Sequence, residues 1–249
     1  MAPVKITNKH HSELLTLIRK HSGKPTQHTF LDGYLGNDHK RYAISMPLLR
    51  VLAKDWMRSH RELTTEIFST LVTSLIRGES STEKILAGIL FDYATKDQRL
   101  AFEPRRISRW LNHLSGWAEV DTVCTNKVTV KEIPSRWQEW KKVLGELSKS
   151  SNINKRRASL VLLCAPLRST QHDDMADVAF ANINRLKKEK EVLITKAISW
   201  VLRSMIRYNR ERLVGFLESN QTSLPAIAVR ETRITLETGK KTARKSKAA

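Results

Sequence analysis

The sequence predicts an all-helical fold, and three observations support this prediction. Nearly every segment of the 249 residues has apolar residues at helical spacing. Strand-like alternation is confined to short runs such as residues 71–76. The chain has only 9 glycines and 7 prolines, which suits helices joined by short connections. About a dozen amphipathic helices fit either a globular bundle or paired helices stacked as a solenoid, and no sequence repeat is sharp enough to decide.

Capping residues mark several expected helix starts. Ser45 and Pro47 occupy the positions of an N-cap and a first-turn proline. Ser80 and Glu83 have the spacing of a capping box, in which each side chain binds a backbone N–H at the helix start. A less regular stretch is expected over residues 29–41, and it includes Tyr34. The other helices are expected over residues 12–21, 63–76, 104–114, 117–128, 134–147, 155–167, 173–186, 191–208, 210–218 and 226–236.

The balance of charge points to a polyanionic partner. There are 44 lysines and arginines against 25 aspartates and glutamates, a formal net charge of +19. This excess favours nucleic acid, although a highly soluble or ribosome-associated basic protein has the same charge. Residues 1–236 are expected to form one helical-repeat domain. Residues 237–249 carry five basic and no bulky apolar residues, so we expect a disordered tail that adds nonspecific attraction to phosphates.

Several classes of protein are disfavoured. No apolar run approaches the roughly 18 residues of a membrane span, and the first residues lack the apolar core of a secretory signal, so a cytoplasmic protein is expected. Cys124 and Cys164 lie in apolar helical patterns and are interpreted as buried thiols. No phosphate loop, nucleophile elbow or HExxH motif occurs. The histidines, including His10 and His11, show no metal-ligand motif, and neither a metal nor a cofactor is expected.

The helix expected over residues 191–208 has one basic face. Helical geometry places Trp200 roughly 130° from the middle of its apolar stripe, beside Lys196, Arg203 and Arg207. Three cations around one indole favour a nucleic-acid surface, and packing of Trp200 on a neighbouring helix is the alternative. The apolar stripe consists of Ile194, Ala197, Ile198, Val201, Leu202 and Met205.

Trp117 and Asp121 are the most informative pair. They are four residues apart, so a helix places both on the same side, at the margin of the apolar face formed by Val120 and Val123. A lone aspartate is more often an ion-pair partner than a catalytic group. A carboxylate among surplus cations nevertheless weakens phosphate binding, which suggests a different task for Asp121.

Arg157 is expected at the exposed start of an apolar helix. A cation near a helix N-terminus is opposed by the helix dipole, so a phosphate or an acidic partner is a reasonable compensation. A salt bridge within the protein is the alternative.

Four stretches together resemble the bacterial AlkD-like family of DNA alkylation repair glycosylases. They are GYLGNDHKRYAISMPLLRVLAKDW, GWAEVDTVC, NINKRRASLVLL and TKAISWVLRSMIRYN, spread over residues 30–236. The resemblance implies HEAT-like repeats stacked into a curved solenoid with a concave basic groove. It implies Asp121 as the catalytic carboxylate, Trp117, Trp200 and Tyr34 as groove aromatics, Arg157 as a contact to the DNA backbone and Arg203 as its helper. Gly116 stands where relatives can carry a second aromatic.

The resemblance also implies an activity and a partner. The expected enzyme is a monomeric, nucleoid-associated glycosylase that releases N3-alkyladenine and N7-alkylguanine from double-stranded DNA without flipping the base. When the N-glycosidic bond breaks, such a cationic base departs as a neutral molecule. A carboxylate can then stabilise the positive charge that builds on the sugar. The alternatives are a non-catalytic binder of branched or distorted DNA on the same fold and a HEAT-type protein scaffold.

Overall fold

The computed structural model describes residues 8–26 and 36–241, and these residues are helical apart from turns and connections. One isolated antiparallel bridge joins Thr26 to Arg41, and no longer β-strand occurs in the described ranges. The all-helical prediction is therefore confirmed. Both cysteines are buried, as expected. Across the described part of the chain, every helix is too short or too polar to cross a membrane.

The described residues form two compact units that divide after Ser135. The prediction of a single repeat domain over residues 1–236 stays a prediction. The helices of the first unit are α1 (Lys9–Ser22), α3 (Met46–Ser59), α4 (Thr65–Ile76), α5 (Ser81–Leu90), α6 (Lys96–Leu100), α7 (Arg106–Trp110), a 3-10 turn (Leu111–His113), α8 (Gly116–Cys124) and α9 (Lys127–Ser135). Those of the second are α10 (Trp137–Ser148), α11 (Ile153–Ser169), α12 (Asp173–Leu186), α13 (Val192–Met205), α14 (Arg210–Asn220) and α15 (Ala226–Thr238).

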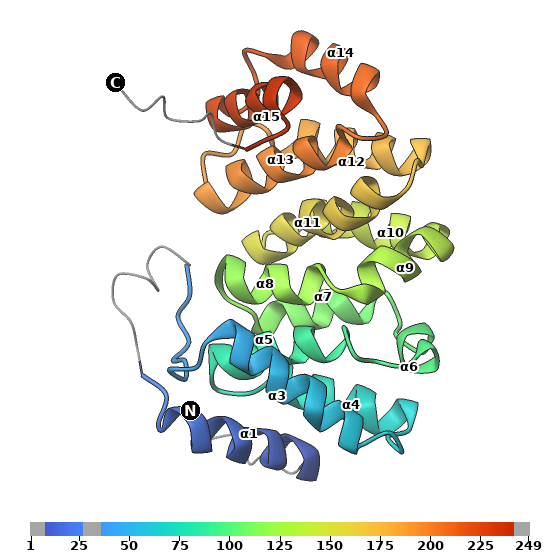
Figure 1. The fold of residues 1–249 in the computed structure, drawn as a ribbon. Coiled ribbons are helices and arrows are strands. Elements are labelled where there is room, and N and C mark those ends of the chain that lie inside the picture. Colours follow the sequence, from blue (N-terminus) through green and yellow to red (C-terminus); the bar gives the residue numbers. More distant parts are fainter. Residues whose placement is uncertain (1–7, 27–35, 242–249) are drawn as a thin grey trace. The chain divides into compact units, whose positions relative to one another are not determined.

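Each unit is built of paired helices in two layers (Figure 1). In the first unit α5 packs between α3 and α8, while α4 packs against α5 on the other layer. In the second unit α13 packs between α11 and α15, and α10 packs against α12. Helices adjacent in sequence thus alternate between layers, which is the arrangement of a helical repeat rather than of a globular bundle. The curvature and the basic groove implied by the resemblance stay predictions.

The core of the first unit contains an aromatic cluster. Phe91 meets Phe68 edge-to-face with ring centroids 5.4 Å apart, and Phe102 and Trp110 pack beside it at centroid distances of 5.5 and 6.0 Å. All four side chains are buried. Such pairs add stabilisation of about 0.5–1.5 kcal/mol beyond the area they bury.

Helix boundaries differ from the prediction at several places. The helix expected over residues 117–128 ends at Cys124, because the side chain of Asn126 turns the chain. Its Nδ2 donates to the carbonyl of Val123 at 2.8 Å, and its Oδ1 accepts from the backbone N–H of Val128 at 3.0 Å. Pro134 lies at the end of α9 rather than at the start of the next helix. The short helix α6 was missed, and α13 ends three residues earlier than expected.

A buried polar network joins α1, α4 and α5. The predicted capping box is present: Ser80 accepts from the N–H of Glu83, whose carboxylate accepts from the N–H of Ser80 at 2.8 Å. His11 lies between Ser74, at 2.7 Å from its Nδ1, and Glu83, at 2.8 Å from its Nε2. His11 and Glu83 are almost inaccessible to water, so the network holds three helices together where no solvent can replace a lost partner.

Gly88 allows α5 and α8 to approach each other closely. A Cβ atom at this position would lie 2.5 Å from the carbonyl oxygen of Thr122 and 2.6 Å from its carbonyl carbon. Because these are backbone atoms of α8, the clash cannot be relieved by rotating a side chain. The position of α8 on α5 therefore depends on a glycine here.

We predict that Gly88→Ala destabilises the protein by about 1–3 kcal/mol, the usual range for overpacking a tight contact. The free energy of unfolding in urea measures the effect. Gly145→Ala is the matched control, since a Cβ there meets nothing within 4 Å and alanine favours the interior of α10. The control should be neutral or stabilised by up to about 1 kcal/mol. Equal stability of the two variants would show that the close approach is unimportant.

We predict that Glu83 makes stability depend on acid pH. Burial raises the pKa of Glu83, but hydrogen bonds from His11 and Ser80 outweigh it and hold the pKa below its ordinary value of 4.5. The resulting stability is present above the unfolded pKa and is lost as pH falls through the folded one. The free energy of unfolding of the wild type should therefore fall below about pH 4.5. Glu83→Gln should be less stable at neutral pH, and its free energy of unfolding should fall less steeply as the pH is lowered. Parallel pH profiles of the two proteins would contradict this role.

Candidate functional site

The first unit contains an open pocket of about 480 Å³. Its walls come from three neighbouring helices of one layer and from the segment that precedes them. Its lining is mostly apolar, with a few polar groups at one side. The lining residues are Arg41, Tyr42, Ile44, Met46 and Leu49, then Ser81, Thr82 and Ile85 of α5, and Trp117, Ala118, Asp121 and Thr122 of α8.

Trp117 and Asp121 line this pocket together. Both side chains are half-buried, while Val120 and Val123 of the same helix are buried against the core. The prediction that the pair shares the margin of the apolar face is therefore confirmed. Asp121 places a carboxylate, and Trp117 an indole, on the same wall of a pocket that is open to solvent.

The start of α8 is anchored by the buried carboxylate of Glu119. Its Oε2 accepts from the backbone N–H of Ser115 at 2.8 Å, which caps the first turn of the helix. His39 places its Nδ1 3.0 Å from Oε1 of the same carboxylate. The hydroxyl of Ser115 also donates to the carbonyl of Gly36 at 3.1 Å. The N-terminus of α8 is thus tied to the segment that carries Arg41 and Tyr42 into the pocket wall.

Lys84 provides the opposite charge beneath α8. Burial lowers the pKa of this ammonium group, and the carboxylates of Glu119 and Glu83 act against that shift. Its Nζ donates to the carbonyl of Ile76 at 3.1 Å and to that of Gly78, at the end of α4. The buried ammonium group is therefore satisfied by backbone carbonyls at the end of α4, and the two buried carboxylates stabilise its charge electrostatically.

Sequence reasoning missed several residues of the pocket. Arg41 ends the stretch expected to be less regular, Tyr42 follows it, and Met46 begins α3 with 40% of its side chain exposed. Tyr42 is held from both sides: its N–H donates to Thr82 at 2.9 Å, and its hydroxyl accepts from Nε of Arg19 at 3.2 Å. Hydrophobic periodicity cannot predict the environment of Arg41 and Tyr42, because an irregular segment has no repeating geometry that separates buried from exposed positions.

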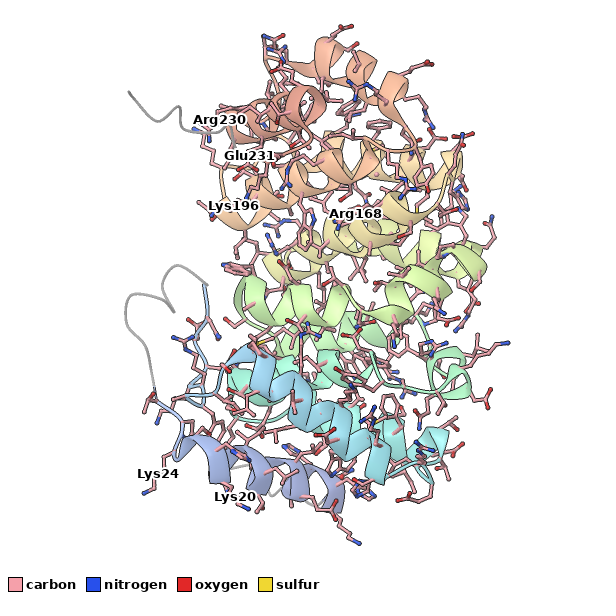
Figure 2. The ribbon with its side chains drawn as sticks, viewed as in Figure 1. Lys20, Lys24, Arg168, Lys196, Arg230 and Glu231 are labelled. Carbon is pink, nitrogen blue, oxygen red and sulfur yellow. The ribbon has the colours of Figure 1, made fainter. Side chains whose placement is uncertain are left out.

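In the second unit, the apolar stripe expected on α13 is confirmed. The six residues of its apolar stripe are completely buried, whereas Trp200 and Lys196 are half-buried. Arg207 is exposed but lies beyond the end of the helix, with its guanidinium 5.0 Å from the centroid of the Tyr208 ring. In Figure 2, Lys196 of α13 and Arg230 of α15 both extend from the left-hand edge of this unit.

Arg203 is held inside this unit. Its guanidinium lies 3.6 Å from the carboxylate of Glu231 on α15, and its Nε donates to the hydroxyl of Ser199 at 3.3 Å. Ser199 donates in turn to Glu231 at 2.5 Å. Burial lowers the pKa of Arg203, and Glu231 partly offsets the shift. The contacts join α13 to α15, and a contribution of Arg203 to a DNA contact stays a prediction.

Arg157 does not lie at an exposed helix end, so that expectation is wrong. Asn152 caps α11 by accepting from the N–H groups of Asn154 and Lys155, so the helix begins four residues before Arg157. Arg157 is 4% exposed, and its Nη1 donates to the carbonyl of Leu193 in the turn that starts α13. Its expected contact to a DNA backbone stays a prediction.

Two further expectations are not tested by the described residues. Tyr34 lies outside them, as do residues 242–249 of the expected tail, while α15 continues to Thr238. The role of Trp117 and Trp200 as aromatics of one groove concerns two different units and stays a prediction.

The comparisons with known proteins agree with this architecture. The DNA alkylation repair enzyme family matches residues 17–236, nearly the whole described chain. No curated protein matches the chain. A solved structure from Enterococcus faecalis, described as a predicted DNA alkylation repair enzyme, superposes with a TM-score of 0.68. It is 18% identical in sequence, and the match covers 84% of this chain and 93% of that one, a likeness of fold. The family match extends over both units, and on that ground the chain belongs to the DNA alkylation repair enzyme family.

Proposed function

We propose that this protein is a DNA glycosylase that hydrolyses the N-glycosidic bond of cationic alkylpurines, N3-alkyladenine and N7-alkylguanine, in double-stranded DNA. The observation that carries the proposal is the presence of Trp117 and Asp121 on one wall of an open pocket in a chain of net charge +19. Membership in the alkylation repair family supports the lesion class.

Asp121 is the proposed catalytic residue. A purine alkylated at N3 or N7 already carries a positive charge, so it leaves as a neutral base and needs no general acid. Positive charge then builds on the deoxyribose. A carboxylate facing the sugar stabilises this oxocarbenium-like state and orients the attacking water, the electrostatic principle that also operates in glycoside hydrolysis.

Trp117 is the proposed partner of the cationic base. The face of an indole attracts a cation with a free energy of about 0.5–2 kcal/mol, and more of this is realised when the site excludes water. Trp117 is half-buried in the pocket wall, so part of its side chain is already shielded from water. Trp200 is proposed to act in the same way from the second unit.

DNA binding is proposed to come from cations on both units. Arg41 lines the pocket and is proposed to hold a phosphate beside the lesion. Lys196 and Arg207 of the second unit supply further phosphate contacts, which are independent of sequence and weaken with salt. In this proposal the sugar of a stacked lesion faces Asp121, so the enzyme grips the backbone and leaves the base in the helix rather than flipping it.

We predict that Asp121→Asn reduces release of 7-methylguanine from methylated duplex DNA by about 10²–10³-fold, the usual cost of removing one preorganised electrostatic group. DNA affinity should be retained or slightly increased, because a negative charge has been removed from a phosphate-binding surface. Asp55→Asn is the matched control, since that carboxylate is 62% exposed on α3 and should be dispensable.

Undiminished release by Asp121→Asn would overturn the catalytic assignment. If the wild type releases no base but binds junction DNA tightly and in a salt-sensitive manner, the protein is a binder of branched or distorted DNA. No preference for DNA at physiological salt would identify a protein scaffold.

We predict that the aromatic character of Trp117 matters beyond its size. Trp117→Phe should retain most release of 7-methylguanine, whereas Trp117→Leu, which keeps an apolar side chain without a π-face, should be slower by about 2- to 30-fold, corresponding to 0.5–2 kcal/mol. Single-turnover release rates measure the difference. Equal rates for the Phe and Leu variants would show that Trp117 only fills space.

A further inference from the structure

Two histidines and a glutamate meet at one edge of the first unit, away from the pocket. His10 and Glu13 lie on the first turns of α1, and His60 follows the last residue of α3. The Oε2 atom of Glu13 is 3.2 Å from Nδ1 of His10 and 3.3 Å from Nε2 of His60. One ligand atom from each residue lies within 4.8 Å of the other two. We propose that this His10–Glu13–His60 cluster binds a zinc ion.

Two of the three distances between the ligand atoms match a tetrahedral site. Ligands about 2.0–2.1 Å from zinc, at tetrahedral angles, are about 3.3–3.4 Å from each other. The two nitrogen–oxygen distances in the cluster are 3.2 and 3.3 Å. Only a small movement of the His10 and His60 rings is then needed to close the third edge around an ion.

The ring of His60 is oriented by a backbone carbonyl. Its Nδ1 lies 2.9 Å from the carbonyl oxygen of Trp56 and, because that oxygen only accepts, donates a proton to it. This hydrogen bond turns Nε2 toward Glu13, where a bound ion would take the place of any proton on Nε2. Metal-binding histidines are commonly oriented by such a hydrogen bond to a carbonyl.

The indole of Trp56 supports both rings. It stacks on His60 with centroids 4.0 Å apart and planes inclined by 18°, and it meets His10 edge-on at 5.6 Å. Trp56 is itself buried, so the two imidazoles rest on a fixed surface. This support reduces the conformational entropy that the ligands lose when an ion binds.

Two nitrogen ligands and one carboxylate favour zinc over calcium or magnesium, which prefer all-oxygen sites. The ligand side chains are 20%, 34% and 21% exposed for His10, Glu13 and His60, so a water molecule can reach the fourth position. The cluster escaped the sequence analysis because Glu13 is one helical turn from His10 but His60 is fifty residues further along. Only the packing of α1 on α3 brings the three together.

The location indicates a structural role for the ion. Met46 lies at the pocket, and His60 follows the opposite end of α3. A helix of this length spans about 20 Å, so an ion at His60 is too far from Asp121 to act on a sugar there. Zinc would instead fasten the start of α1 to the end of α3. This inference does not depend on the proposed glycosylase activity.

Binding is tested with Zn²⁺ and Co²⁺ on the untagged full-length chain. Calorimetry should show one Zn²⁺ per chain with release of protons, and Co²⁺ should produce the visible absorption of a tetrahedral complex that Zn²⁺ abolishes. His60→Gln and Glu13→Gln should each weaken binding at least 10-fold. His21→Gln, which changes an exposed histidine at the other end of α1, should bind like the wild type.

Stability provides a second measurement. Saturating Zn²⁺ should raise the Tm of the wild type and of His21→Gln, but not of the two ligand variants, because only the folded wild-type site binds the ion. Release of 7-methylguanine should be the same with Zn²⁺ and with a chelator, so loss of the zinc site and loss of the glycosylase are distinguishable. The inference is overturned if folded His60→Gln and Glu13→Gln bind Zn²⁺ as tightly as the wild type, or if no tetrahedral Co²⁺ spectrum appears.

Discussion

The buried carboxylate of Glu119 is the interaction on which the pocket depends. It fastens the N–H of Ser115, and hence the first turn of α8, to His39 in the preceding segment. It has no exposure to water, so its charge must be satisfied by these partners and by Lys84. If α8 were free to rotate or slide, Trp117 and Asp121 would leave the wall that they share. A residue that faces away from the pocket thus determines where the pocket's chemical groups lie.

The same region shows how close packing and electrostatics act together. Gly88 lets α5 approach the backbone of α8 at Thr122, and the buried ammonium of Lys84 on α5 interacts electrostatically with the carboxylate of Glu119 on α8. One interaction acts through shape and the other through charge. A buried charge that loses its partners costs about 1–3 kcal/mol or more. The core of the unit therefore holds in place the helix that carries Asp121, the preorganisation that its proposed role requires.

Some residues of the candidate site could be predicted from sequence patterns, and others could not. Trp117 and Asp121 were found from their spacing, because four residues on a helix correspond to one face. The apolar stripe of α13 was found in the same way, and all of its members are buried. The expectation for Arg157 failed because Asn152 starts α11 earlier than the pattern of apolar residues indicated. Arg41 and Met46 were missed because they come from a segment without periodicity, or from its boundary.

The sequence by itself determined the helical class, most helix positions, the capping box at Ser80 and the surplus of positive charge. These are local properties, set by spacing along the chain and by side-chain contacts to the nearest backbone. Only the tertiary structure decided which residues meet across helices: Glu119 with His39, Gly88 with Thr122, and His60 with Glu13. Such pairs are separated by tens of residues. Their distances depend on how helices pack, which depends on the sum of many weak contacts and leaves no mark at any single position.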